Sequence, residues 1–122
     1  MTEPHDLGRK GELVAAEYLE KAGYKILHKN WRSGRKELDV VAENSEFIIF
    51  VEVKTRTDNF PVLPPRDLVS PEKQRSVEYA AEAYIKCYGI TKEYRFDVVT
   101  IRSSGKTMEI DHIPGAFYPT LR

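Results

Sequence analysis

The sequence has a single cysteine, no excess of charge of either sign and no long hydrophobic run. Cys87 stands alone among 122 residues, which excludes an internal disulfide. Lys and Arg number 19, as do Asp and Glu, so the formal net charge is zero. A neutral chain has no overall field to attract nucleic acid or anionic lipid, so such binding would need a local patch. No apolar run approaches the roughly 18 to 20 residues that cross a bilayer, so we expect no contact with a membrane.

What remains is the composition of one ordinary globular domain. A chain of 122 residues lies inside the range of about 100 to 200 that one domain takes. Residues 1–25 are too charged for the apolar core of a signal peptide. The lone cysteine suits a reducing compartment. We therefore expect one domain over residues 1–122, located in the bacterial cytoplasm.

Apolar spacing predicts a helix, three strands, a second helix and two strands, which is an α/β sheet with helices packed on it. Asp6 is expected as the N-cap of the first helix and Gly23 as its stop; Ser70 and Gly89 play these parts for the second. The elements are expected at residues 7–22, 24–32, 37–42, 47–54, 70–89, 95–102 and 106–113. The proline-containing segment 57–69 should be a mobile loop, and residues 114–122 an irregular tail.

Two opposite charges, Glu52 and Lys54, follow a run that leaves no polar face. The run is FIIFV, residues 47–51, and five apolar residues in a row are typical of a strand covered on both sides. Charges that continue such a strand are costly unless they bind each other or a metal. The alternative is that they are ordinary solvent-face charges at the end of a half-exposed strand. The apolar run favours a site.

The turn ENSE decides which side chains stand beside these charges. A two-residue loop in it would pair Asp39 with Phe50 and Glu37 with Glu52. Paired residues point the same way, so Glu37, Asp39, Glu52 and Lys54 would converge on one face, with Asp39 diagonal to Glu52. A three-residue loop would shift the register by one residue and scatter the group.

Carboxylates held this close repel one another and attract a divalent ion. Two of them with a backbone carbonyl, here that of Val53, can hold Mg²⁺ with waters completing the octahedron. Such an ion lowers the pKa of a bound water and neutralises a phosphate, while Lys54 can orient that water or stabilise the developing charge. The chemistry that suits this set is phosphodiester hydrolysis.

One local basic patch precedes these strands and surrounds Trp31. It contains Lys25, Lys29, Arg32, Arg35 and Lys36, with no acid among them. A basic patch with an aromatic residue suits phosphate contact with base stacking, but a strand edge guarded by lysines has the same sequence. The candidate nucleic-acid contacts are Lys29, Trp31, Arg32, Arg35 and Arg56.

Asp39 followed by Glu52-Val53-Lys54 resembles the PD-(D/E)xK nuclease signature, with Leu38 in place of its proline. A longer series of motifs is more specific. It comprises GRKGE at 8–12, NWR at 30–32, ELD at 37–39, FVEVKTR at 50–56, KQ at 73–74 and RFDVV at 95–99. Together they resemble the YraN-like family of small bacterial proteins over residues 8–101. That family is similar to archaeal Holliday-junction resolvases and implies a three-layer restriction-endonuclease-like fold, a mixed sheet flanked by helices in the order αβββαββ.

The resemblance also implies roles for particular residues. Glu12, on the first helix, would join Asp39 and Glu52 as a metal ligand, and Lys54 would be the catalytic cation. Glu37 and Gln74 would support this set, although the tyrosine expected four residues after Gln74 is absent. We interpret Arg95 and Asp97 as a structural ion pair at a strand start.

Three functions follow from these residues. The first is a Mg²⁺- or Mn²⁺-dependent endonuclease acting on branched or single-stranded DNA, with DNA favoured over RNA. The second is a nucleic-acid-binding module with little turnover. The third is an interaction protein whose charges form a structural ion cluster. A homodimer joining two basic patches would offset the neutral charge, which otherwise weighs against tight nucleic-acid binding.

Overall fold

In the part of the chain that the structure describes, two helices and five strands follow one another in the predicted order αβββαββ. The computed structural model describes residues 4–57, 62–64 and 67–119, with only the backbone of 4–9 and Thr57. The elements are α1 Pro4–Lys21, β1 Lys25–Ser33, β2 Lys36–Glu43, β3 Phe47–Thr57, α2 Pro71–Tyr88, β4 Glu93–Ser104 and β5 Thr107–Phe117. None of the helices in this described part is long and apolar enough to cross a membrane.

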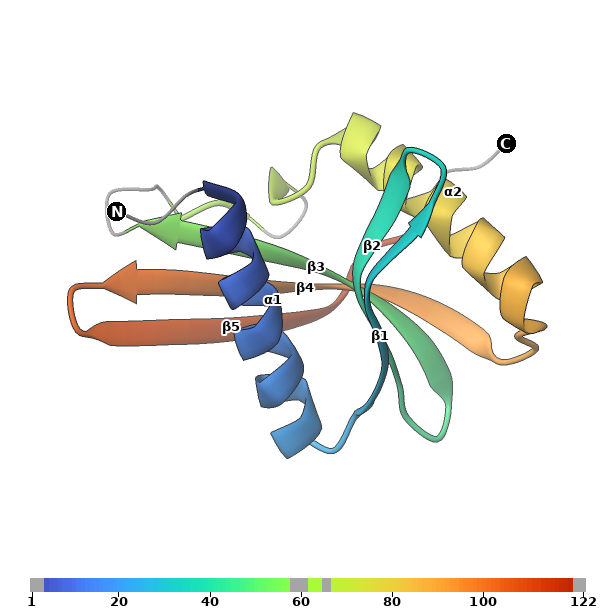
Figure 1. Cartoon of the computed structure of the whole chain (residues 1–122), viewed down its shortest axis with the longest axis horizontal. Helices are drawn as coiled ribbons and strands as arrows, with labels where there is room; N and C mark the ends of the chain where they lie inside the picture. The colour runs from blue at the N-terminus through green and yellow to red at the C-terminus, as the bar shows by residue number, and fades with distance from the viewer. Residues whose placement is uncertain (1–3, 58–61, 65–66, 120–122) are drawn as a thin grey trace.

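The strands form one mixed sheet in the order β1-β2-β3-β4-β5. All neighbours are antiparallel except β3 and β4, which are parallel. The connection between these parallel strands contains α2, as parallel pairing requires a crossover. Figure 1 shows α1 crossing in front of the sheet and α2 at the right. The predicted α/β class and mixed sheet are confirmed.

Apolar side chains of β3 enter two different cores, one on each face of the sheet. Ile49 and Val51 pack with Ala15 and Leu19 of α1. On the other face lie Ile48 and Phe50, packed with α2 through Val77, Ala80, Ala81 and Tyr84. The sheet is therefore the middle of three layers, and the prediction that FIIFV is covered on both faces is confirmed.

The ends of the helices were predicted with mixed success. Ser70 caps α2, because its Oγ accepts a hydrogen bond from the Lys73 N–H at 3.1 Å, and Gly89 ends the helix at a φ of 59°. Gly23, just past α1, has a φ of 101°, which a glycine adopts without strain. The Asp6 N-cap was wrong. The helix already begins at Pro4, a residue whose fixed φ suits a first helical position.

Two strands run further than their sequences predict. β3 continues to Thr57 because it pairs with β4 as far as Ser103. β5 continues through the predicted irregular tail to Phe117, which pairs with Phe96 and stacks on its ring with centroids 4.9 Å apart. Of the predicted mobile loop, residues 58–61 and 65–66 lie outside the described residues, as do 120–122 of the tail. Elsewhere in that loop the Asp67 N–H donates to the Pro64 carbonyl at 2.9 Å.

Candidate functional site

β2 and β3 pair in a register two residues away from the predicted one. Val41 faces Phe50 and Glu43 faces Ile48. The reason is Asn44, whose side-chain oxygen accepts hydrogen bonds from the N–H groups of residues 46 and 47 and so closes a longer loop. The predicted pairing was wrong, but a shift of two residues leaves every side chain on its face. Asp39 and Glu52 come next after the last pair, Val40 with Val51, so they oppose one another directly rather than diagonally.

The side chain of Asp39 binds the backbone of Val53, the residue between Glu52 and Lys54. Its Oδ2 accepts a hydrogen bond from the Val53 N–H at 2.9 Å, just beyond the point where the ladder of paired residues between the two strands ends. The side chain of Asp39 thus takes the place of a backbone partner. This contact brings the two acids of the predicted signature to one point on the α2 side of the sheet.

Glu52 is the buried member of this pair, with 2% of the residue exposed. Its Oε1 has no hydrogen-bond partner among the residues that the structure describes. Its Oε2 lies 4.0 Å from the Nζ of Lys54 and 4.0 Å from the Nζ of Lys73, both too far for a hydrogen bond. A buried carboxylate oxygen without a partner is costly, and a cation is the group that would best satisfy it.

Burial raises the pKa of Asp39 above its ordinary value, against the opposing effect of the Val53 amide. Burial, and then the nearby charge of Asp39, raises the pKa of Glu52 to about 8. The positive charges of Lys73 and Lys54 oppose both shifts. The two carboxylates therefore hold negative charge only at a free-energy cost, and a divalent cation would remove that cost.

Lys73 is a residue of the site that sequence reasoning missed. It lies in the first turn of α2, and residues 58–70 separate this helix from the end of β3, so spacing could not connect Lys73 with Glu52. The only signal was the KQ motif at 73–74, but the resemblance assigned the supporting role at the acids to the neighbouring Gln74. Gln74 instead donates its side-chain N–H to the Val69 carbonyl at 2.9 Å and ties α2 to the preceding segment. Its supporting role at the acids stays a prediction.

Glu12 reaches the sheet from α1, the helix on the opposite face. It is 9% exposed, which confirms the expectation that it points inward. Its carboxylate lies against the amide of Asn30. With the amide nitrogen turned toward Glu12, it donates to Oε1 at 2.9 Å and to Oε2 at 2.5 Å. Nowhere in the described part of the chain do three or more His, Cys, Asp or Glu side chains group closely enough to hold a metal. The metal-binding role of Glu12 therefore stays a prediction.

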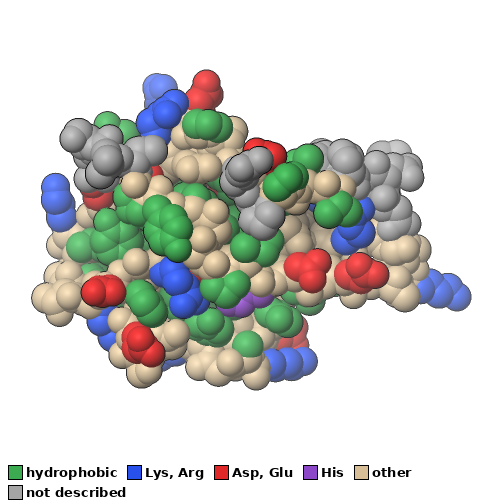
Figure 2. Space-filling view, turned by 180° about the vertical axis from the view of Figure 1, so that it is seen from behind, with side chains coloured by type: hydrophobic (Ala, Val, Ile, Leu, Met, Phe, Trp, Pro, Cys, Tyr) green, Lys and Arg blue, Asp and Glu red, His purple; other side chains and the backbone are tan. Residues whose placement is uncertain are grey.

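The predicted basic contacts lie mostly at the surface. Lys29, Arg32 and Arg35 are exposed, whereas Arg56 is half-buried and donates to the Thr55 carbonyl at 3.2 Å. Arg32 Nε lies 3.2 Å from Glu37 Oε2, so part of the patch is already neutralised by an acid of the same hairpin. Figure 2 shows acidic, basic and hydrophobic side chains interspersed over the face opposite that of Figure 1. The basic residues around Trp31 therefore form only a local patch, as expected for a chain with zero net charge.

Trp31 belongs to an aromatic cluster between β1 and α2. Its ring packs edge-on against Tyr84, with centroids 5.1 Å apart, and its N–H donates to the Tyr88 hydroxyl at 3.2 Å. His28 lies in the same cluster, with Nδ1 2.7 Å from the Tyr84 hydroxyl. Part of the Trp31 ring is thus engaged by the fold. Its role in base stacking stays a prediction.

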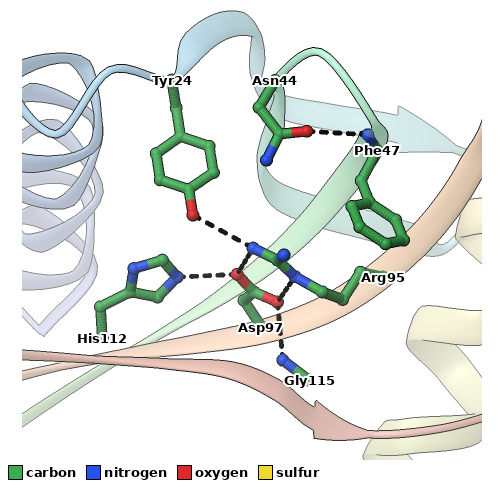
Figure 3. Close-up of polar contacts among 7 residues, drawn as sticks. All are labelled: Tyr24, Asn44, Phe47, Arg95, Asp97, His112 and Gly115. Atoms are coloured by element: carbon green, nitrogen blue, oxygen red, sulfur yellow. Dashed lines mark hydrogen bonds and ion pairs between the residues drawn. The ribbon is translucent and has the colours of Figure 1, made fainter.

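Arg95 and Asp97 form the structural ion pair that was expected (Figure 3). The carboxylate of Asp97 is fully buried and accepts hydrogen bonds from Arg95, from His112 at 2.7 Å and from the Gly115 N–H at 2.9 Å. Burial alone would raise the pKa of Asp97, but these donors outweigh it and hold the pKa below its ordinary value. Arg95 also donates to the Tyr24 hydroxyl at 3.1 Å, which links β4 to the start of β1.

Comparison with known proteins finds similar proteins in several bacteria. A family model described as "Uncharacterised protein family UPF0102" matches residues 11–101. The chain is 46% identical over 121 residues to a UPF0102 protein of Bacteroides fragilis, covering 99% of each chain. It is 43% identical to a UPF0102 protein of Bacteroides thetaiotaomicron over 121 residues, covering 99% of each chain. A UPF0102 protein of Parabacteroides distasonis is 43% identical over 122 residues, covering 100% of both.

Proposed function

The chain belongs to the uncharacterised protein family UPF0102, and we propose that it is a metal-dependent endonuclease acting on branched or single-stranded DNA. The observation that carries this proposal is the pair Asp39 and Glu52. They face one another in the middle of β3, just past the end of its pairing with β2. One Glu52 oxygen has no hydrogen-bond partner among the described residues, and two lysines lie nearby. The three-layer arrangement of helices around a mixed sheet supports the same class of protein.

The donor set suits Mg²⁺ or Mn²⁺, which prefer oxygen ligands. Asp39 and Glu52 would hold the ion, with the Val53 carbonyl as a third oxygen. When bound, such an ion activates a water and neutralises charge on the phosphate. The raised pKa values of the two acids support this assignment, because perturbed carboxylates in close pairs concentrate at functional sites.

The lysines would act on the phosphate and on the attacking water. Lys54 keeps 21% of its side chain exposed and Lys73 keeps 37%, so each can reach a substrate while remaining 4.0 Å from Glu52. A fixed positive charge at this point stabilises the charge that develops on the phosphate in the transition state. The surrounding contacts to the DNA backbone would come from Lys29, Trp31, Arg32, Arg35 and Arg56. A homodimer would double this set.

A binding module with little turnover is the second candidate. It is favoured by the finding that no three His, Cys, Asp or Glu side chains of the described residues group closely enough to hold a metal. In this case the same surface would hold nucleic acid, and the acids would contribute little to cleavage.

A cleavage assay separates the two functions. Junction, flap, single-stranded and duplex DNA would be incubated with the protein and Mg²⁺ or Mn²⁺. We expect cleavage that is lost in Glu52→Gln and Lys54→Met. The matched controls are Glu46→Gln, an exposed acid at the turn before β3, and Lys106→Met, an exposed lysine of the last hairpin turn. Both controls should cleave like the wild type. Cleavage that survives Glu52→Gln would overturn the proposed site.

Binding measurements decide the remaining cases. If no DNA is cut, but binding is present and is lost in the combined variant Lys29→Ala, Arg32→Ala and Arg35→Ala, the binding module is the function. If neither DNA nor metal binds, the acids and lysines form the structural ion cluster of an interaction protein. The same samples, sized with and without junction DNA, test the homodimer.

A further inference from the structure

Tyr79 is an aromatic side chain that the fold leaves open to solvent. It lies on α2, and 64% of the residue is exposed. Two later tyrosines of the same helix, Tyr84 and Tyr88, pack their rings against Trp31. Tyr79 packs on no other aromatic ring among the described residues. It is therefore more accessible than Trp31 to a ligand that stacks on an aromatic ring.

Positive side chains lie beside this ring. The Nζ of Lys36, an exposed residue at the start of β2, is 6.0 Å from the ring centroid, which is within cation–π range. Arg75 is also exposed and precedes Tyr79 by four residues, so the two share one face of α2. Glu82 follows Tyr79 by three residues and places negative charge on the other side. A phosphate chain beside Tyr79 would therefore run toward Arg75 and away from Glu82.

The Tyr79 ring lies a short distance from the acids Asp39 and Glu52. Lys73, in the first turn of α2, has its Nζ 4.0 Å from Glu52. Tyr79 stands six positions after Lys73, which is about 9 Å along a helix. Lys36 stands three positions before Asp39, which is about 10 Å along a strand. Stacked nucleotides of one strand are about 3.4 Å apart, so about three of them would span the distance from Tyr79 to the acids.

We propose that Tyr79 stacks on an unpaired base, with Lys36 and Arg75 at the neighbouring phosphates, and so selects DNA that has a single-stranded segment beside the cleaved bond. This inference rests on the proposed function and narrows its substrate. Flaps and single strands present unpaired bases, whereas a duplex and a four-way junction keep their bases paired and stacked on one another. Stacking on a tyrosine is possible for every kind of base, so the selection is for unpaired strands rather than for a sequence.

The test is the fluorescence anisotropy of labelled DNA in EDTA, so that binding is measured without cleavage. The three ligands are a thymine single strand, a duplex of the same length and a strand of abasic nucleotides, which keeps the phosphates but has no bases. Tyr79→Leu keeps an apolar side chain and removes the ring. We expect it to weaken binding of the thymine strand about 5- to 150-fold, the loss of one base stack. Its affinities for the duplex and the abasic strand should stay at the wild-type values.

Three further variants show whether the ring itself is responsible. Tyr79→Phe keeps a ring that can stack and should bind the thymine strand like the wild type. Tyr118→Leu removes another tyrosine, which is 75% exposed, and should leave all three affinities unchanged. Lys36→Met should weaken the thymine and abasic strands alike and reduce the salt dependence of their binding by about 0.7 in the logarithmic slope, the share of one phosphate. Wild-type binding of the thymine strand by Tyr79→Leu, or an equal loss on the abasic strand, would overturn the stacking role.

Glu52→Gln separates this inference from the proposed function. It removes a proposed metal ligand, so it should abolish cleavage and yet bind the thymine strand in EDTA as tightly as the wild type. Binding that depends on Tyr79 in a wild-type protein that cuts no DNA would support the stacking role and overturn the endonuclease. Flap cleavage by Tyr79→Leu with the rate and affinity of the wild type would support the endonuclease and overturn the stacking role.

Discussion

Asp39 accepts a hydrogen bond from the backbone N–H of Val53 at 2.9 Å, just beyond the last paired residues of β2 and β3. A side chain therefore supplies the contact at the point where backbone pairing ends. The bond fixes one carboxylate opposite Glu52, which lies beside Val53 in the chain. The burial of Glu52 and the nearby charge of Asp39 therefore both raise the pKa of Glu52.

Asp39→Asn should lower the pKa of Glu52 from its value of about 8 in the wild type. Burial would still raise that pKa, but the repulsion from a neighbouring carboxylate would be gone. The amide oxygen can still accept the Val53 N–H, so stability should change little. Asp39→Ala would leave that N–H without its acceptor and cost about 1 to 3 kcal/mol in the free energy of unfolding. An NMR titration of the glutamate carboxyl carbons and urea denaturation measure the two effects. An unchanged Glu52 pKa in Asp39→Asn would contradict the coupling.

Lys73→Met should raise the pKa of Glu52 further, at least as much as Lys54→Met does. Both Nζ atoms lie 4.0 Å from the same carboxylate oxygen, and both lysines favour its ionised form. The same NMR titration measures both variants. Lys86→Met, an exposed lysine in the last turn of α2, is the matched control and should leave the Glu52 pKa unchanged. A shift in Lys54→Met with none in Lys73→Met would show that Lys73 lies away from the acids in solution.

Asp97 should make the protein sensitive to acid. Its folded-state pKa is lower than the ordinary value of 3.8, so it contributes stability above that value. This stability is lost as the pH falls through the folded-state pKa, because the unfolded chain takes up the proton first. Urea denaturation across about pH 5 to pH 1 should show the loss. Asp97→Asn should abolish this contribution and cost about 3 to 5 kcal/mol at neutral pH, because Arg95 keeps a largely buried charge.

The matched control for Asp97→Asn is Glu109→Gln, an exposed acid on β5. It should unfold at the wild-type denaturant concentration at neutral pH and should keep the acid sensitivity. Equal stabilities of Asp97→Asn and Glu109→Gln would mean that the buried network contributes nothing measurable.

Gly11→Ala should destabilise the protein by about 1 to 3 kcal/mol, because the added methyl group overlaps the hydroxyl of Thr55. Thr55→Ala removes that hydroxyl. The double variant Gly11→Ala with Thr55→Ala should therefore be more stable than the sum of the two single effects indicates. Thermal or urea unfolding of the four proteins measures the coupling. Strict additivity would mean that α1 does not approach β3 as closely as the structure shows.

Local chemistry in the sequence was sufficient to predict the order of elements and much of their extent. Ser70 marks the start of α2 and Gly89 marks its end. Both could be predicted because a side-chain cap and a left-handed residue act within one turn of the chain. The tail was predicted less well. Pro114 and Gly115 suggest an end to β5, yet pairing of Phe117 with Phe96 carries the strand past them. Strand length depends on a partner that is distant in sequence.

The residues of the candidate site also divide into those that the sequence predicted and one that it did not. Glu52 and Lys54 were found because charges that follow five apolar residues are conspicuous in a sequence. Asp39 was placed on the correct face even though its pairing was wrong, because side chains alternate along a strand and an even shift preserves the face. Lys73 was missed, since no periodic pattern crosses the segment between β3 and α2.

The sequence by itself thus determined the αβββαββ order, the two-sided burial of β3 and the face on which its charges lie. These features depend on alternation, helical spacing and caps, all of which act between near neighbours in the chain. The tertiary structure alone decided the approach of Lys73 to Glu52 and the contact of Asn30 with Glu12. Each of these depends on how separate elements pack, and packing brings together residues that no local pattern relates.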